Sequence, residues 1–226
     1  MIPKKELLRK YNVSYLCKEE YKIVSNEIFY REIYKVNLIN PSPLIFDAGS
    51  HIGLSVLYFK DVYPNSIIHA FEPNPNVYAI LQENIDQNAL QNIQTYNIAL
   101  GKKDTKRLLY IDSSGMCAFS TGSFKKNAWN GKQQTQPIEV NTERLSNYIH
   151  QNVDLLKMDI EGAEIEVLED LNANGKMKYI KNIIFEYHPS KKHSIGKIIN
   201  KFMSDYEVKM TDMGEGLVLV IGQKRS

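Results

Sequence analysis

One short segment constrains the fold of this 226-residue chain more than any other. An apolar run at 44–46 stops at the carboxylate of Asp47, and the chain then passes through a turn that contains Gly49 and Gly53. The next segment, 54–62, has the pattern of a helix. A strand, a glycine turn and a helix in this order bring the backbone close to a ligand at the carboxyl end of the strand. The segment therefore predicts an α/β fold with a ligand site beside Asp47.

The charge of Asp47 selects among the ligands that such a turn could hold. In the dinucleotide-binding version of the turn, this position is glycine and the ligand is an anionic pyrophosphate. The Asp47 carboxylate would repel a pyrophosphate, but it would attract the ammonium group of an amino-acid-like ligand such as S-adenosylmethionine (AdoMet). This pattern favours methyl transfer as the reaction.

Composition sets further limits. A chain of this length with 43% hydrophobic residues fits one α/β domain. Lys+Arg 28 and Asp+Glu 26 nearly balance, which is not typical of proteins that bind nucleic acid or an acidic membrane. Cys17 and Cys117 lie far apart, which indicates reduced thiols and neither a disulfide framework nor a zinc site. Without an apolar leader or a bilayer-length apolar stretch, we expect a soluble cytoplasmic protein.

From residue 43 onward, short apolar runs alternate with helical segments. This alternation predicts a mostly parallel sheet with helices on both faces. The strands are predicted near 44–46, 67–71, 93–98, 155–158, 180–185, 207–210 and 217–221. The helices are predicted near 54–62, 77–87, 142–150, 163–171 and 195–205. The last two strands should pair through a turn that contains Gly214 and Gly216.

We expect two parts in the chain. Residues 1–40 form an N-terminal helical cap segment, because apolar side chains recur at helical spacing over 18–36. This helix should cap either the ligand cleft or the sheet. Residues 41–226 form the catalytic domain, which carries an inserted hairpin or lid at about 102–141.

The insertion is predicted because a helix is missing after residue 99. Two short strands, near 107–111 and 136–140, flank the polar stretch 112–135. A polar connection of this length is more often functional than inert, so it is a candidate lid over the acceptor. Trp129, in this stretch, either closes over a substrate or anchors the hairpin tip.

A second carboxylate follows the next strand. Glu72 lies about 20 residues beyond Gly49, the separation at which doubly wound folds place an acid against ribose hydroxyls. Pro73 then ends the strand. The alternative is that Glu72 caps the following helix, but together with Asp47 the ribose interpretation is favoured.

A third strand ends at Asp159, with Glu161 two residues further on. Carboxyl ends of adjacent strands meet at one crevice, so Asp47, Glu72 and Asp159 should face the same cavity. Several acids in one cleft need a cation. A sulfonium ligand would supply one; a divalent metal held by Asp159 and Glu161 is possible but is not predicted.

A fourth strand runs into Glu186 and His188, which alternation places on one face. A histidine with an ordinary pKa is a natural general base for a hydroxyl acceptor. We therefore take His188, Glu186 and Asp159 as the catalytic candidates. A purely structural role for His188 is equally open.

Five segments of the chain form a pattern together. They are Phe-Asp-Ala-Gly-Ser-His-Ile-Gly at 46–53, Phe-Glu-Pro-Asn at 71–74, Asn-Ile-Ala-Leu-Gly at 97–101, Lys-Met-Asp-Ile-Glu-Gly-Ala-Glu at 157–164 and Phe-Glu-Tyr-His at 185–188. In register over about 27–222, the chain resembles the FkbM family of AdoMet-dependent methyltransferases. The resemblance implies a Rossmann-like class I methyltransferase fold, with a seven-stranded, mostly parallel sheet and an antiparallel last strand.

The resemblance also implies roles for individual residues. It implies that Asp47, Gly49 and Gly53 hold the methionine part of AdoMet, that Glu72 holds the ribose, and that the Ala99 backbone holds the adenine. Further cofactor contacts are expected from Ser50, His51, Pro73 and Asp159. Family members usually have Ala-Asn where this chain has Ser50-His51, so the contacts at these two positions are expected to differ.

O-Methylation of a small-molecule or natural-product hydroxyl, on a sugar or a polyketide, is the reaction that the resemblance favours. Methyl esterification of a peptide or small-molecule carboxylate is the alternative. From other classes, an NAD-dependent oxidoreductase and a cofactor-binding pseudoenzyme remain possible. We expect an acceptor substrate as partner, with no nucleic acid and no membrane. The sequence leaves the identity of the acceptor and the oligomeric state open.

Overall fold

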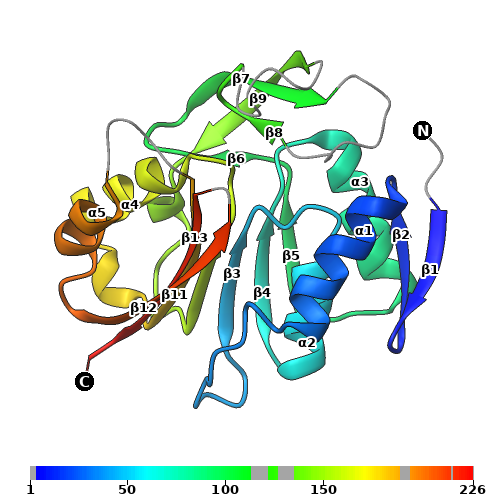
Figure 1. Ribbon diagram of the computed structural model, residues 1–226, viewed down its shortest axis with the longest axis horizontal. Helices are drawn as coiled ribbons and strands as arrows, with labels where there is room; N and C mark the ends of the chain where they lie inside the picture. The colour runs from blue at the N-terminus through cyan, green and yellow to red at the C-terminus, as the bar shows by residue number, and fades with distance from the viewer. Residues whose placement is uncertain (1–3, 113–121, 127–134, 189–193, 215, 226) are drawn as a thin grey trace.

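The structure, a computed structural model, describes residues 4–112, 122–126, 135–188, 194–214 and 216–225. In these residues a central sheet is flanked by helices, and a smaller sheet lies across one end of it (Figure 1). An N-terminal hairpin packs at the side of the molecule. No helix in the described ranges is both long and apolar enough to cross a membrane.

The central sheet has seven strands. Their order is β12 (Tyr206–Gly214), β13 (Leu217–Lys224), β11 (Asn182–Tyr187), β10 (Leu155–Met158), β3 (Leu44–Ala48), β4 (Ile67–Phe71) and β5 (Ile93–Tyr96). β13 runs antiparallel to both of its neighbours, whereas the pairs from β11 to β5 are parallel. The predicted mostly parallel seven-stranded sheet with an antiparallel last strand is therefore confirmed.

The middle strands are apolar because both of their faces are covered. Every residue of β3 and of β10 is buried, as expected for central parallel strands. The side chain of Ile45 belongs to one hydrophobic cluster, and those of Leu44 and Phe46 belong to another. Because side chains alternate along a strand, β3 contributes to the core on both sides of the sheet.

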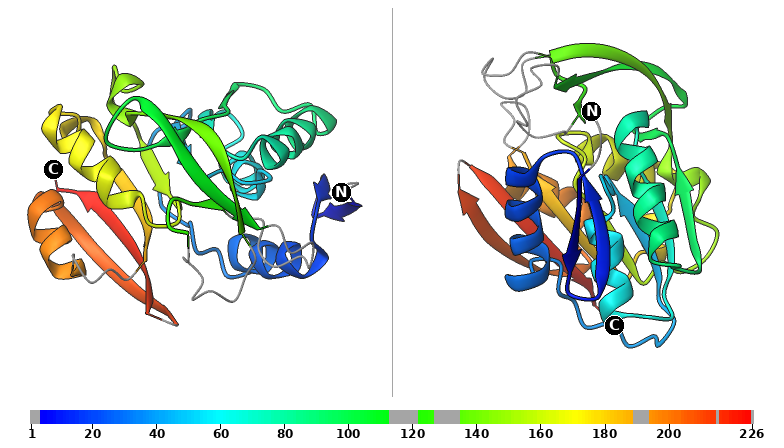
Figure 2. Two further views of the ribbon diagram at one scale, coloured as in Figure 1. Left: turned by 90° about the horizontal axis from the view of Figure 1, so that it is seen from above. Right: turned by 90° about the vertical axis from the view of Figure 1, so that its right-hand side faces the viewer.

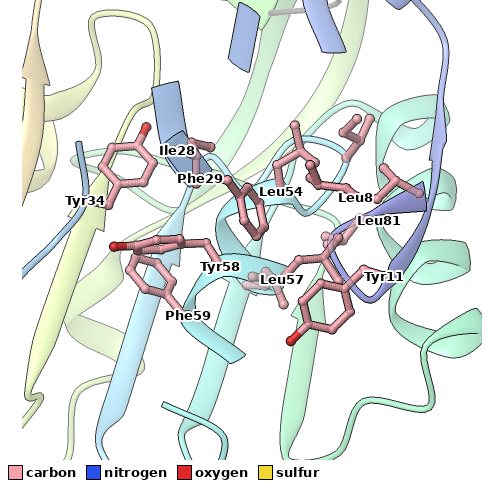
Figure 3. Close-up of a cluster of buried hydrophobic side chains, with 14 of the residues drawn as sticks. Leu8, Tyr11, Ile28, Phe29, Tyr34, Leu54, Leu57, Tyr58, Phe59 and Leu81 are labelled. Atoms are coloured by element: carbon pink, nitrogen blue, oxygen red, sulfur yellow. The ribbon is translucent and has the colours of Figure 1, made fainter. Parts of the chain in front are cut away.

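Helices cover the two faces of the sheet unequally. Toward one side lie α1 (Lys18–Ser25), α2 (Leu54–Val62) and α3 (Pro75–Gln87), and toward the other lie α4 (Glu164–Ala173) and α5 (Ile195–Phe202) (Figures 1 and 2). Figure 3 shows the cluster on the α2 side, where Leu57, Tyr58 and Phe59 pack with Phe29 and Tyr11. This hydrophobic cluster therefore packs the N-terminal segment against the central sheet.

The strand order reverses direction between β3 and β10. From β3 the chain continues outward through β4 to β5, and from β10 it continues outward on the other side through β11. The chain therefore leaves β3 and β10 toward opposite sides of the sheet, and a crevice is expected at the carboxyl ends of these strands. This is where a ligand is expected to bind.

A second sheet lies across that end of the central sheet. It consists of β6 (Ala99–Leu100), β9 (Thr135–Glu143), β7 (Thr105–Asp112) and β8 (Gly122–Ser123), in that order. β7 and β9 pair antiparallel, with Arg107 opposite Val140, so the two strands predicted in the insertion are present (Figure 2). Trp129 lies outside the described residues, and the lid role stays a prediction.

Two local predictions are wrong. The helix predicted at 142–150 is absent, because β9 continues to Glu143 and only a 3₁₀ turn, Leu145–Asn147, follows. There the Ser146 backbone N–H and hydroxyl donate to Asp170, at 2.9 and 2.7 Å. The helix predicted at 18–36 consists of α1 and a π-helix, Asn26–Tyr30, and ends before Glu32, whose φ is 51°.

The hairpin of β1 (Lys4–Leu8) and β2 (Tyr11–Tyr15) was not predicted. It is held by Asn84 of α3, which is fully buried. The Asn84 side chain accepts from the Ser14 backbone N–H at 2.6 Å and donates to the carbonyls of Ser14 and Ile52 at 2.9 and 2.7 Å. One amide side chain therefore joins the hairpin, α3 and the loop that precedes α2.

We predict that Asn84→Ala lowers the free energy of unfolding by roughly 2–4 kcal/mol, because it leaves buried backbone groups without partners. Urea denaturation followed by circular dichroism measures the change. Among the described residues, the side chain of the exposed Gln91 donates only to the nearby Ala89 carbonyl, so Gln91→Ala should change stability by less than about 0.5 kcal/mol. Equal effects of the two substitutions would contradict the bridging role of Asn84.

Candidate active site

A cavity of about 750 Å³ lies at the carboxyl ends of β3, β4, β10 and β11. α1 forms one wall, and residues of β7, β8 and the loop after β8 form another. Most of the predicted site residues line the cavity: Gly49, Ser50, His51, Glu72, Pro73, Ala99, Asp159, Glu161, Glu186 and His188. Asp47 and Gly53 do not line it.

The glycine turn is held against the loop after β10. Gly49 has φ +77°, and a Cβ at this position would lie 1.8 Å from the carbonyl oxygen of Asp159. Only glycine fits, for both conformational and steric reasons. The backbone N–H groups of Gly49 and Ser50 donate to the Phe71 carbonyl at 3.0 and 2.9 Å. His51 also has a positive φ, 50°, a conformation that histidine tolerates better than most residues.

Asp47 differs from the sequence-based expectation, because it does not face the cavity. Its side chain is fully buried, and Oδ2 accepts a hydrogen bond of 2.6 Å from the Ser55 hydroxyl at the start of α2. Lys157 Nζ lies 3.2 Å from Oδ1. A carboxylate that is taken out of water requires such a partner, so its charge is compensated inside the protein.

Lys157 is a residue of the site that was not predicted from the sequence. It lies on β10 directly beside Asp47 in the parallel pairing of β10 with β3, it is 2% exposed, and it lines the cavity. Burial alone would lower the pKa of the lysine, but the charges of Asp47 and Asp159 raise it above its ordinary value. A charged residue within an otherwise apolar, buried strand was the signal that could have identified it.

Glu72 faces the cavity while two backbone groups hold its carboxylate. One oxygen accepts from the His51 N–H at 3.1 Å and the other from the Asn74 N–H at 2.8 Å. The α3 helix is capped by the Asn74 side chain, which accepts from the Asn76 N–H at 3.1 Å. Burial raises the pKa of Glu72, and His51 and the backbone donors oppose the shift. Each carboxylate oxygen retains a lone pair for a further donor.

Asp159 and Glu186 form an acidic part of the wall. Asp159 accepts a hydrogen bond of 3.3 Å from the hydroxyl of the buried Tyr34. The negative charge of Asp159, together with burial, raises the pKa of Glu186 to about 8. Glu186 therefore changes its protonation state near neutral pH, as a general base or acid must.

His188 is paired with two carboxylates. Its Nε2 lies 3.2 Å from Glu161, and its Nδ1 lies 3.5 Å from Glu164 without hydrogen-bond geometry. Burial would lower the pKa of His188, but the two carboxylates outweigh burial and raise it to about 11. An imidazolium cannot accept a proton, so this geometry argues against His188 as the general base.

Glu161 lies in the turn between β10 and α4, and Glu164 is the first residue of α4. Glu161 has φ 52°, and Glu164 accepts from the backbone N–H groups of Ile160 and Gly162 at 3.1 Å each. In the described part of the chain, no group of three or more His, Cys, Asp or Glu side chains is arranged to hold a metal. Glu161 has His188 as its partner, which leaves the possible Asp159–Glu161 metal site without structural support.

The other end of the cavity is apolar. Ile98, Ala99 and Leu100 line the cavity there, and Leu109 of β7 belongs to the same hydrophobic cluster as Ala99. The cavity therefore combines an apolar part, which can take a flat apolar group, with the acids that line the rest of it.

Comparisons with known proteins show the family to which the chain belongs. The family described as "Methyltransferase FkbM domain" matches residues 47–210. Methyltransferase 1 of Beauveria bassiana is 31% identical over 191 residues, which cover 77% of this chain and 76% of that protein. The 2-O-methyltransferase NoeI of Sinorhizobium fredii is 28% identical, with 62% and 60% covered. The 31-O-demethyl-FK506 methyltransferase FkbM of Streptomyces tacrolimicus is 23% identical, with 72% and 74% covered.

Solved structures share the fold. A methyltransferase FkbM from Methylobacillus flagellatus has a TM-score of 0.56 at 15% identity and covers 87% of this chain, which corresponds to 47% of that chain. TYW2 from M. jannaschii, solved in complex with AdoMet, has a TM-score of 0.51 at 14% identity, with 99% and 87% covered. Given the family match over 47–210 and the 31% identity to a methyltransferase over most of both chains, this chain belongs to the FkbM family of methyltransferases.

Proposed function

We propose that this protein transfers a methyl group from AdoMet to a hydroxyl group of a small-molecule acceptor, such as a sugar or a polyketide. The observation that carries the proposal is Glu72, a buried carboxylate at the cavity wall, held by the backbone of the glycine turn. Its free lone pairs suit the two vicinal hydroxyls of a ribose. Names of two relatives, a 2-O-methyltransferase and a 31-O-demethyl-FK506 methyltransferase, support oxygen as the acceptor atom.

The residues of the cavity fit the parts of AdoMet in order. Glu72 would hold the ribose, the apolar end around Ala99 would hold the adenine, and the turn from Gly49 to His51 would hold the methionine part. Because Asp47 is paired with Lys157, the acids available to a cation are Asp159 and Glu186. Neither forms an ion pair within 4.0 Å in the described residues.

When bound, AdoMet supplies an electrophilic methyl group on a sulfonium. The protein has to align the acceptor oxygen with that group and take up the hydroxyl proton. Glu186, with its pKa raised to about 8, is the side chain suited to accept this proton. His188 instead holds Glu161 in place through their ion pair. A carboxylate acceptor would need no base, so dependence on Glu186 distinguishes methylation of an alcohol from formation of a methyl ester.

The proposal is tested by incubating the protein and deuterated-methyl AdoMet with cell extract, followed by mass spectrometry. A labelled methyl group on the oxygen of one class of hydroxyl compound is the expected result. Label on a carboxylate would favour the esterification alternative. Calorimetry that detects no uptake of AdoMet or S-adenosylhomocysteine (AdoHcy) would overturn the proposed function.

Glu72→Gln is expected to weaken AdoHcy binding roughly tenfold to a hundredfold, because a charged acceptor of the ribose hydroxyls is lost. Isothermal titration calorimetry gives the Kd. Glu139→Gln is the matched control, since Glu139 is exposed on β9 and pairs with Lys106 at 2.8 Å. An unchanged Kd for Glu72→Gln would remove Glu72 from the ribose site.

With the labelled acceptor in hand, kcat/KM should rise with pH and level off above about 8, because Glu186 must be deprotonated to act as the base. Glu186→Gln should abolish this rise and reduce kcat by roughly a hundredfold to ten-thousandfold. His188→Gln should keep the rise. If the rise disappears in His188→Gln and persists in Glu186→Gln, the assignment of the base is wrong.

His188 should also make stability depend on pH. Its folded-state pKa is raised from 6.5 to about 11, so its stabilising contribution is complete below 6.5 and disappears as the pH rises through 11. His188→Gln should therefore be more destabilising in urea denaturation at about pH 6 than at about pH 10. His150→Gln, at an exposed position, should change stability by less than about 0.5 kcal/mol at either pH. A pH-independent effect of His188→Gln would contradict the paired imidazolium.

A further inference from the structure

Lys157 is a buried charged group to which the proposed chemistry gives no role. It is placed in the middle of the central sheet, with its side chain 2% exposed. A lysine is almost never buried to this extent unless its ammonium group is paired. The arrangement around its Nζ atom therefore indicates what the residue does.

The ammonium group contacts the glycine turn as well as Asp47. It donates to the Gly49 carbonyl at 2.7 Å and lies 3.4 Å from the Ala48 carbonyl. Its distance to Asp47 Oδ1 is 3.2 Å, and it lies 5.3 Å from the centre of the Tyr34 ring. One cation thus lies beside Asp47 near the end of β3 and also contacts the carbonyls of Ala48 and Gly49, where the turn begins.

The amide side of the same turn is fixed by other groups. Gly49 and Ser50 donate to the Phe71 carbonyl, and His51 donates to Glu72. The carbonyl of Gly49 receives its hydrogen bond from Lys157. The turn lines the cavity. Its N–H groups are held by Phe71 and Glu72, and its Gly49 carbonyl is held by Lys157.

We propose that Lys157 is a positioning residue for the cofactor: its ammonium group orients the Gly49 carbonyl and so keeps the turn from Gly49 to His51 in the shape that binds AdoMet. This inference rests on the proposed function. Asp47 has a supporting role, because it neutralises the lysine and allows the charge to be buried. The pair thus acts on the cofactor through the backbone of the turn.

If the Asp47–Lys157 pair only stabilised the fold, substitutions of the pair would have a different effect on AdoHcy binding. Lys157→Met keeps most of the length of the side chain but leaves Asp47 as a buried charge without its cation, so it should lower the melting temperature. Asp47→Asn combined with Lys157→Met removes both charges and should restore most of the melting temperature. If the lysine positions the turn, the double variant should still bind AdoHcy roughly tenfold to a hundredfold more weakly than the unmodified protein, because the Gly49 carbonyl has lost a charged donor.

Lys60 supplies a matched control. It is a buried lysine on α2, 5% exposed, and it donates to the Ser66 carbonyl without lining the cavity. Lys60→Met should lower the melting temperature and leave the affinity for AdoHcy unchanged.

The test is isothermal titration calorimetry with AdoHcy and thermal denaturation of all four proteins. A restored melting temperature with weakened binding in the double variant supports the inference. Binding of the double variant equal to that of the unmodified protein overturns it and leaves the proposed function intact. If the unmodified protein itself fails to bind AdoHcy, both are overturned.

Discussion

The close approach of Gly49 to the carbonyl oxygen of Asp159 is the contact on which the rest of the site depends. A Cβ atom at residue 49 would lie 1.8 Å from that oxygen, a separation that packed atoms cannot adopt. The absence of a side chain lets the turn after β3 rest directly on the loop after β10. These loops follow the neighbouring strands β3 and β10, between which the strand order reverses. The cavity and its acids are therefore placed by a backbone contact rather than by any one charged group.

Electrostatic pairing then decides which acids are available to a ligand. Asp47 is compensated by Lys157 and Glu161 by His188, while Glu72 accepts two backbone hydrogen bonds. Asp159 and Glu186 lack a cation at ion-pair distance in the described residues, and the charge of Asp159 raises the pKa of Glu186. A positively charged methyl donor suits this end of the cavity. At neutral pH the negative charge at this end of the cavity comes mainly from Asp159, rather than from Asp47 as the sequence suggested, because Glu186 has its pKa raised to about 8.

The sequence predicted those parts of the fold that depend on local pattern. Apolar runs that end in Asp47, Glu72, Asp159 and Glu186 predicted parallel strands whose carboxyl ends meet, and all but Asp47 line the cavity. What could not be predicted depends on contacts between distant residues. The Asp47–Lys157 pair requires the register of β3 with β10.

Contacts between distant residues also explain the elements that were predicted wrongly or not predicted at all. The 142–150 segment has helical periodicity, but Asp170 takes the hydrogen bonds of Ser146 in another conformation. The first hairpin shows little apolar pattern in β1 and is anchored by Asn84, about 70 residues away in sequence. Nothing in the sequence indicated that Glu161 and Glu164 would flank His188, because these contacts too join residues that are distant in the sequence.

A crystal structure of the protein with AdoHcy is the most direct measurement of whether this cavity is a methyl-donor site. We expect the ribose hydroxyls within hydrogen-bond distance of Glu72, the adenine beside Ala99, and the amino-acid part on the glycine turn with Asp47 still paired to Lys157. AdoHcy bound outside the cavity, or an Asp47 side chain turned into it to hold the ligand's amino group, would contradict this assignment.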